Sequence, residues 1–150
     1  MRILVTGGAG YIGSTVASAC EEAGHEVVIL DDLSAGRHEF VKDRTFYEGD
    51  IADQPLLDRV FTEQGIDAVV HCAAKIIVPE SVADPLGYYE NNVGKTVKLL
   101  QGMQRNDVNR ILFSSSASIY ATDDEFKVTE DSALDPGSPY ATTKFMVEHI

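Results

Sequence analysis

Residues 2–14 read RILVTGGAGYIGS, and this stretch decides the fold. Arg2–Thr6 is a short apolar run, as expected of a parallel strand that is covered on both faces. From Tyr11 onward the apolar residues follow a helical spacing, which ends at Gly24, a residue type common just past a helix. A strand, a glycine-rich turn and a helix in this order make the first part of a βαβ unit.

Strand and helix patterns alternate along the rest of the chain. Further strands are predicted at Glu26–Leu30, Thr45–Glu48, Ala68–His71 and Arg110–Ser114. Helices are predicted from Asp53 to Gly65, over 85–105, and from Ser138 through Ile150. The helix at 85–105 should place on one side, either core or subunit interface, the residues Leu86, Tyr89, Val93, Val97, Leu100 and Met103. This alternation predicts an α/β fold, a doubly wound parallel sheet of the Rossmann type.

The glycine run fits two phosphate-binding spacings at once. Gly7, Gly10 and Gly13 match G-x-x-G-x-x-G, and Gly8 with the last two matches G-x-G-x-x-G. Glycine permits the tight turn and the close approach of the backbone to a pyrophosphate, which the helix N-terminus then binds through its N–H groups. Asp31 follows the run by about 20 residues, where a carboxylate would bind ribose hydroxyls and repel a 2′-phosphate. The stretch therefore predicts a dinucleotide site that favours NAD over NADP.

A tyrosine and a lysine share one face of the last predicted helix. Tyr140 and Lys144 lie one turn apart, and an ammonium beside a phenol favours the phenolate, which can take a proton from a hydroxyl. Such a pair is common on helix surfaces, but this one follows the fifth predicted strand. That strand ends in Ser114, Ser115 and Ser116, at the sheet edge where ligands bind in such folds. The position indicates an acid–base pair.

The composition excludes several classes of protein. The 150 residues include 24 acidic and 12 basic side chains, and a net charge of −12 argues against binding to nucleic acid or to an anionic membrane. Cys20 and Cys72 lie in apolar contexts, which favours reduced thiols and a cytoplasmic protein. His71 at a strand end has no ligand-spaced partner, and the acidic stretch 121–137 lacks the order of a calcium loop, so no metal is expected.

With these motifs the chain resembles the extended short-chain dehydrogenases, and among them the 4-epimerases that act on UDP-sugars. The resemblance covers the whole chain, and the segment at 78–93 is its most specific part, because the glycine and tyrosine motifs are shared by the wider superfamily. The matching motifs are TGGAGYIGS at 6–14, DDLS at 31–34, GDI at 49–51, HCAAK at 71–75, VPESVADPLGYYENNV at 78–93, FSSSASIY at 113–120 and SPYATTK at 138–144.

The resemblance implies NAD as the cofactor and a set of residues that bind it. Those implied near the phosphates are Gly7, Gly10, Tyr11, Ile12 and Gly13, and those around the adenosine are Asp31, Asp32, Leu33, Ser34, Asp50 and Ile51. Along the rest of the groove it implies Cys72, Ala73, Ala74, Lys75, Asn91, Ser114, Tyr140 and Lys144. Lysine often stands one place later than Lys75 in the family, and Ala121 and Ala141 replace usual glycines.

The resemblance also implies a catalytic set of Ser116, Tyr140 and Lys144. In such enzymes the tyrosine deprotonates the sugar O4 while the C4 hydride passes to NAD. The 4-keto sugar then turns over, and the hydride returns to its other face. The implied reaction is interconversion of UDP-glucose and UDP-galactose, and the implied whole protein is a homodimer.

Several alternatives stay open. The family needs a C-terminal sugar-nucleotide domain, and the last helical pattern is still periodic at Ile150, so residues 1–150 are expected to be an NAD-binding Rossmann domain that is inactive by itself. A 4,6-dehydratase would need an acid–base pair where this chain has Ser115 and Ser116. A UDP-glucuronate-type epimerase or decarboxylase remains possible, and so does a module that binds NAD without turnover. Which UDP-sugar is used also stays open.

Overall fold

The computed structural model describes residues 1–121 and 127–150, which form two compact units. The sheet unit consists of residues 1–74 and 95–114, and the helical unit of residues 75–94 and 115–150. Part of the acidic stretch at 121–137 lies outside the described residues. The extent of a single NAD-binding domain over 1–150 stays a prediction.

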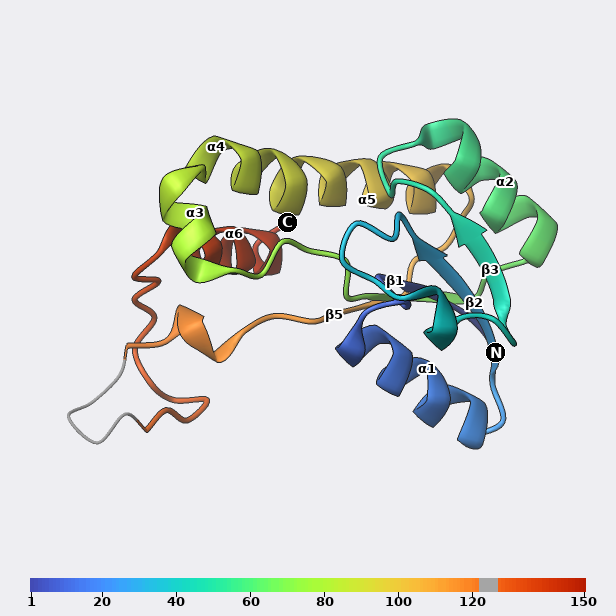
Figure 1. Cartoon of the computed structure of the whole chain (residues 1–150), viewed down its shortest axis with the longest axis horizontal. Coiled ribbons are helices and arrows are strands. Elements are labelled where there is room, and N and C mark those ends of the chain that lie inside the picture. The colour runs from blue at the N-terminus through green and yellow to red at the C-terminus, as the bar shows by residue number, and fades with distance from the viewer. Residues whose placement is uncertain (122–126) are drawn as a thin grey trace. The chain divides into compact units, whose positions relative to one another are not determined.

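Five parallel strands make the core of the sheet unit (Figure 1). They are β1 (Arg2–Thr6), β2 (Glu26–Asp31), β3 (Thr45–Glu48), β4 (Ala68–His71) and β5 (Ile111–Phe113), in the order β3-β2-β1-β4-β5. Thr6 at the end of β1 pairs with Leu30 on one side and with His71 on the other, so the carboxyl ends of three strands are level. This order confirms the predicted doubly wound sheet, and its switch point lies between β1 and β4.

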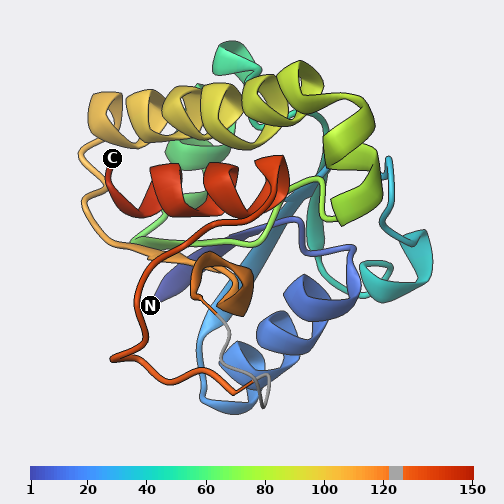
Figure 2. The same cartoon turned by 90° about the vertical axis from the view of Figure 1, so that its left-hand side faces the viewer.

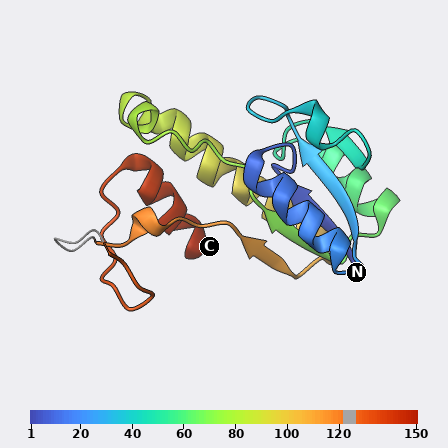
Figure 3. The ribbon, with the colours of Figure 1, turned by 60° about the horizontal axis from the view of Figure 1, so that its bottom comes forward.

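Three helices cover the two faces of this sheet (Figure 3). On one face α1 (Tyr11–Glu22) packs against alternate side chains of β1 and β2, including Ile3, Val5 and Ile29. On the other face α2 (Gln54–Gln64) and α5 (Lys95–Arg105) pack against the intervening side chains, including Leu4 and Leu30. Side chains that alternate along a strand face opposite sides, so both apolar sets are removed from water.

The helix boundaries of the sheet unit follow from local chemistry. Asp53 begins α2 by accepting a hydrogen bond from the Leu56 backbone at 3.1 Å, and Gly65 ends it with φ +60°. Gly24 has φ +82°, and its N–H bonds to the Glu21 carbonyl just past α1. Both ends confirm the predicted caps.

The helical unit contains α3 (Val78–Ala83), α4 (Pro85–Tyr88), a π-helical turn η2 (Tyr89–Gly94), a short 3₁₀ turn η3 (Ala117–Ile119) and α6 (Pro139–Glu148). Helix α6 packs against α3, α4 and η2 (Figure 2). Ser138 begins α6 as predicted, because its Oγ accepts from the Ala141 N–H at 3.1 Å, and Pro139 occupies the first helical position.

The predicted helix over 85–105 is present with its predicted bounds, but it differs from the prediction in two respects. The π-helical turn η2 interrupts it between α4 and α5. The predicted apolar side is only partly right: Met103 is buried, but Leu86 is 79% exposed, and the other buried residues are Tyr88, Asn92, Thr96, Leu99 and Gly102. Two of these five are polar and are buried because their side chains are hydrogen-bonded, which a count of apolar residues does not detect.

Smaller differences concern the ends of elements. Helix α6 ends at Glu148 rather than continuing through Ile150, and β5 is shorter than the predicted strand Arg110–Ser114. Helix α3 was not predicted from the sequence pattern. Among the described residues no helix has both the length and the apolar character needed to cross a bilayer.

Candidate cofactor and catalytic site

The glycine turn between β1 and α1 packs too closely for side chains at three of its positions. A Cβ on Gly13 would lie 2.2 Å from the Gly7 carbonyl oxygen, one on Gly7 would lie 2.6 Å from the Ala73 nitrogen, and one on Gly8 would lie 2.6 Å from the Ile29 Cγ2. Gly7 also has φ +73°, which glycine adopts without strain. At Gly10 a Cβ would lie 3.3 Å from the Gly7 oxygen, a tight contact but a milder one than at Gly7, Gly8 or Gly13.

Gly10 caps α1 without a side chain, in an extended conformation with φ −81° and ψ 171°. The first turn of a helix has backbone N–H groups without intrahelical partners, and no acidic residue lies in the first turn of α1. Tyr11 and Ile12, which begin the helix, are 83% and 57% exposed. This arrangement fits the pyrophosphate of a dinucleotide, which would lie against bare backbone.

Asp31 ends β2 and connects the glycine turn to the next loop. Its buried carboxylate accepts a hydrogen bond from the Ala9 N–H at 3.0 Å and another from the Leu33 N–H at 2.8 Å. Leu33 has φ +57°, so this turn is tight. Each carboxylate oxygen has a second lone pair, so Asp31 can hold the loops and still accept from ribose hydroxyls.

Asp32 and Ser34 form a second, exposed turn in the same loop. The Ser34 hydroxyl and N–H donate to one Asp32 oxygen at 2.6 and 2.9 Å. Partial burial raises the pKa of Asp32, but the bonds from Ser34 and the positive charge of Lys95 outweigh it, so the pKa lies below its ordinary value. The turn therefore presents a carboxylate at the predicted adenosine end.

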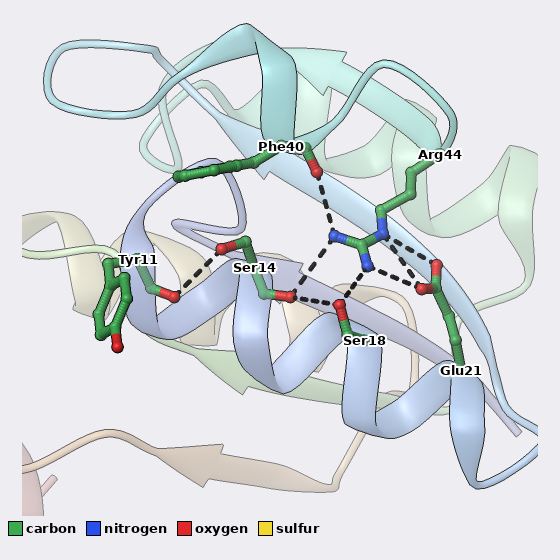
Figure 4. A network of polar contacts seen from close by, with 6 residues as sticks. All are labelled: Tyr11, Ser14, Ser18, Glu21, Phe40 and Arg44. Carbon is green, nitrogen blue, oxygen red and sulfur yellow. Dashed lines mark hydrogen bonds and ion pairs between the residues drawn. The ribbon is translucent and has the colours of Figure 1, made fainter.

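The loop after this turn is tied to α1 by one arginine (Figure 4). The Arg44 guanidinium donates to the Glu21 carboxylate at 2.8 Å, to the Ser18 hydroxyl at 2.7 Å and to the Phe40 carbonyl at 3.0 Å. Sequence reasoning missed Arg44, because its partners are spread over two separate segments. The network holds the far end of the loop at 32–44 against α1. This loop is called the adenosine loop below, because the predicted adenosine contacts Asp32, Leu33 and Ser34 lie in it.

Asp50 and Ile51 follow β3, next to the predicted adenine position. The Asp50 carboxylate accepts from the Ala52 N–H at 2.8 Å and forms an ion pair with Lys95 at 2.5 Å. The Ile51 side chain is buried in the core between the sheet and α2, so only its backbone can contact a ligand.

The residues after β4 line the glycine turn. The Cys72 N–H donates to the Thr6 carbonyl at 2.9 Å, Ala73 packs against Gly7, and Ala74 is half-buried. His71 is buried, with its two ring nitrogens hydrogen-bonded to the hydroxyls of Thr6 at 2.7 Å and Thr96 at 2.8 Å. These contacts give His71 a structural role at the end of β4.

In the helical unit, α6 carries the predicted acid–base pair. Tyr140 lies in its first turn and is half-buried, whereas Lys144, one turn later, is only 3% exposed. A lysine is rarely buried to this extent unless its ammonium has polar partners. The Tyr140 carbonyl accepts from the Thr143 hydroxyl at 2.7 Å, which fixes the first turn of the helix.

Ser114 and Ser116 fall in different units. The Ser114 N–H bonds to the His71 carbonyl at 3.0 Å and extends the pairing of β5 with β4. In the helical unit the Ser116 hydroxyl caps η3, with its Oγ 2.8 Å from the Ser118 Oγ. A hydroxyl both donates and accepts, so this capping leaves Ser116 with capacity for a substrate oxygen.

Asn92 organises the helical unit, although sequence reasoning assigned a role only to its neighbour Asn91. The Asn92 side chain accepts from the Lys75 N–H at 2.8 Å and donates to the Lys75 carbonyl and to the Thr143 hydroxyl, both at 3.0 Å. Asn91 also donates to its oxygen at 3.0 Å. The signal in the sequence is helical spacing, since Tyr88, Asn92 and Thr96 share one face.

Lys75 and Tyr88 are also neighbours in the helical unit. The Lys75 ammonium lies 5.6 Å from the centre of the Tyr88 ring, a cation–π distance. Burial and a hydrogen bond to Glu80 raise the pKa of the Tyr88 hydroxyl, which keeps it protonated.

As for metal ligands, no cluster of three histidine, cysteine or acidic side chains occurs within 1–121 and 127–150.

This chain has a parallel βαβ unit, a glycine turn that caps its helix without a side chain, and a buried aspartate at the end of the second strand. These features define a Rossmann-type dinucleotide-binding protein. The family model described as the NAD dependent epimerase/dehydratase family matches residues 3–150, and the chain belongs to this family.

Curated relatives include the UDP-glucose 4-epimerases of Halalkalibacterium halodurans and Bacillus subtilis, which are 47% and 45% identical to this chain. Each match covers 100% of the chain but only 45% and 47% of the relative. The chain thus spans about half the length of these proteins.

Solved structures of UDP-glucose 4-epimerases also match nearly the whole of this chain over about half of their own length. The UDP-glucose 4-epimerase of Brucella ovis, in complex with NAD, has a TM-score of 0.92 at 40% identity and matches 99% of this chain and 46% of its own. The enzyme of Stenotrophomonas maltophila, with bound NAD and formylated UDP-arabinopyranose, has a TM-score of 0.93 at 38% identity, over 99% and 47% of the two chains.

Proposed function

We propose that the chain is the cofactor-binding half of an NAD-dependent 4-epimerase that interconverts UDP-glucose and UDP-galactose. The observation that carries the cofactor assignment is the glycine turn, where Gly10 caps α1 with bare backbone and Asp31 joins this turn to the adenosine loop. The matched UDP-glucose 4-epimerases and their complexes with NAD support the substrate and the cofactor.

In this proposal the cofactor held by the glycine turn and Asp31 would be NAD, which would supply a reversible acceptor for the C4 hydride of the sugar. The Tyr140 phenolate removes the proton of the sugar O4 and gives it back at the end of the reaction. The ammonium of Lys144 favours the phenolate by its positive charge. Ser116 donates a hydrogen bond to the substrate oxygen.

The assignment of NAD as the cofactor is tested by calorimetric titration of the 150-residue chain and of Gly10→Ala with NAD. Alanine can adopt the φ and ψ of Gly10, and its Cβ would have one tight contact, 3.3 Å from the Gly7 oxygen, so the melting temperature should fall only slightly. Its methyl group would occupy the space of the pyrophosphate, so the affinity for NAD should fall by about tenfold or more. The control is Gly137→Ala, because a Cβ there would meet nothing within 4 Å. Equal affinities of Gly10→Ala and the unaltered chain would contradict the assignment.

The proposed catalytic roles are tested in a chimera in which this chain replaces the matching part of the Bacillus subtilis relative. The chimera should convert UDP-galactose, whereas the 150-residue chain by itself should bind NAD without turnover. Tyr140→Phe should lower kcat of the chimera by about 10²–10⁴-fold, the usual contribution of a positioned acid–base group. Tyr47→Phe, which removes a hydroxyl bonded to Glu63, is the matched control. An active Tyr140→Phe chimera would exclude the proposed base.

We also propose that the whole protein is a cytoplasmic homodimer. Cys20 and Cys72 are outside any disulfide, which agrees with a reducing compartment. Leu86 of α4 projects an exposed apolar side chain, which a subunit contact would cover. A chimera that stays monomeric in light scattering at micromolar concentration would exclude the dimer.

A further inference from the structure

Lys95 lies at the first position of α5, and no motif of the dinucleotide site includes it. Its ammonium contacts one oxygen of the Asp50 carboxylate at 2.5 Å, while the Ala52 N–H donates to the other oxygen at 2.8 Å. Both oxygens of Asp50 are thereby held, and the carboxylate cannot rotate without losing a contact.

The stability of the fold does not explain this ion pair. The side chains of Lys95 and Asp50 are 27% and 38% exposed, and water screens a pair with this exposure, so it contributes little to folding. An ion pair that stabilises little can still orient a group that binds a ligand.

The charge of Lys95 reaches a second acidic residue of the adenosine region. It is one of the causes that hold the pKa of Asp32 below its ordinary value, after the hydrogen bonds from Ser34. In a chain with a net charge of −12, this ammonium offsets two carboxylates where an anionic dinucleotide would bind.

We propose that Lys95 is a positioning residue that fixes the Asp50 carboxylate so that it accepts a hydrogen bond from the exocyclic amine of adenine. This inference rests on the NAD site proposed above. Each Asp50 oxygen keeps a lone pair for the amine after its contact with Lys95 or Ala52. Without the ammonium the carboxylate is free to turn toward water, and the bond to the amine loses its fixed geometry.

The experiment compares NAD with its hypoxanthine analogue, in which an oxygen replaces the adenine amine, by calorimetric titration of the 150-residue chain. The unaltered chain should prefer NAD by about tenfold, the value of one hydrogen bond to a charged group. Lys95→Met should lower the affinity for NAD by about five- to tenfold but that for the analogue by less than about twofold, so the preference disappears. Lys95→Arg, which keeps the positive charge, should retain most of the preference.

The control on the same helix is Lys98→Met, which removes an exposed lysine whose ammonium lies 3.4 Å from the side-chain oxygen of Gln101. This variant should leave both affinities unchanged. Asp50→Asn should lose the preference, and adding Lys95→Met to it should change nothing further. A parallel fall for both dinucleotides in Lys95→Met, or an unchanged preference, would overturn the inference and leave the NAD site standing. If the unaltered chain bound neither dinucleotide, the proposed function itself would fall.

Discussion

The buried side chains of the sheet unit are mostly apolar, whereas the described part of the helical unit buries more polar side chains than apolar ones. In the helical unit the buried polar residues are Ser81, Asn92, Thr143 and Lys144, and the buried apolar residues are Tyr88, Ile119 and Ala141. The sheet unit instead has an apolar core on each face of its sheet.

This difference indicates how each unit keeps its shape. Apolar burial is non-directional and tolerates changes of side chain that preserve volume. A buried hydrogen-bond network is directional, and it costs free energy when one partner is lost. The proposed cofactor turn therefore stands on a robust core, while the proposed catalytic helix depends on a few specific polar contacts.

The largest expected effect comes from the core of the sheet unit. Leu57 on α2 is fully buried among apolar residues, so Leu57→Ala should lower the free energy of unfolding by about 2–5 kcal/mol, measured by urea denaturation. Leu86→Ala is the matched control in the helical unit, because Leu86 is exposed, and it should change stability by less than about 0.5 kcal/mol. Similar losses in the two variants would contradict the assignment of the core.

The second prediction concerns the polar network of the helical unit. Asn92→Ala leaves the Lys75 N–H and carbonyl without their partners and should cost about 1–3 kcal/mol. Hydrogen exchange should accelerate in 75–94 and in α6, while β1, β2 and β4 keep their protection. Equal acceleration in the strands would show that the stability of the helical unit does not depend on its own polar network.

The smallest effect is expected at a surface contact of the sheet unit. Hydrogen bonds from Arg105 and Asn106 lower the pKa of Asp58 below its ordinary value of 3.8. Because the folded-state pKa is the lower one, the stabilisation is present above the unfolded value and is lost as the pH falls through the folded value.

The measurement is the urea midpoint of the unaltered chain and of Asp58→Asn, at neutral pH and below about pH 3. The variant should be slightly less stable at neutral pH, and the difference should vanish in acid. Arg105→Gln should also lose most of this pH dependence. A difference that persists in acid would assign the effect to packing rather than to the charge of Asp58.

Much of the fold could be predicted because its signals are local. The apolar runs of β1, β2 and β4 and the caps at Asp53 and Gly65 depend on neighbouring residues alone. Over 85–105 the helix was predicted, but the burial of Asn92 and Thr96 was not, because it depends on hydrogen-bond partners far away in the chain.

For the site, the sequence by itself determined which residue types are available: a glycine turn before a helix, an acid at the end of the second strand, and a tyrosine and lysine one turn apart. Local backbone geometry requires these types, so their pattern is visible in the chain. Only the tertiary structure decided that Asp31 joins two loops, that Asn92 anchors Lys75 to α6, and that Lys95 reaches Asp50. These contacts join residues distant in sequence, and no local pattern specifies a distance that only the folded chain creates.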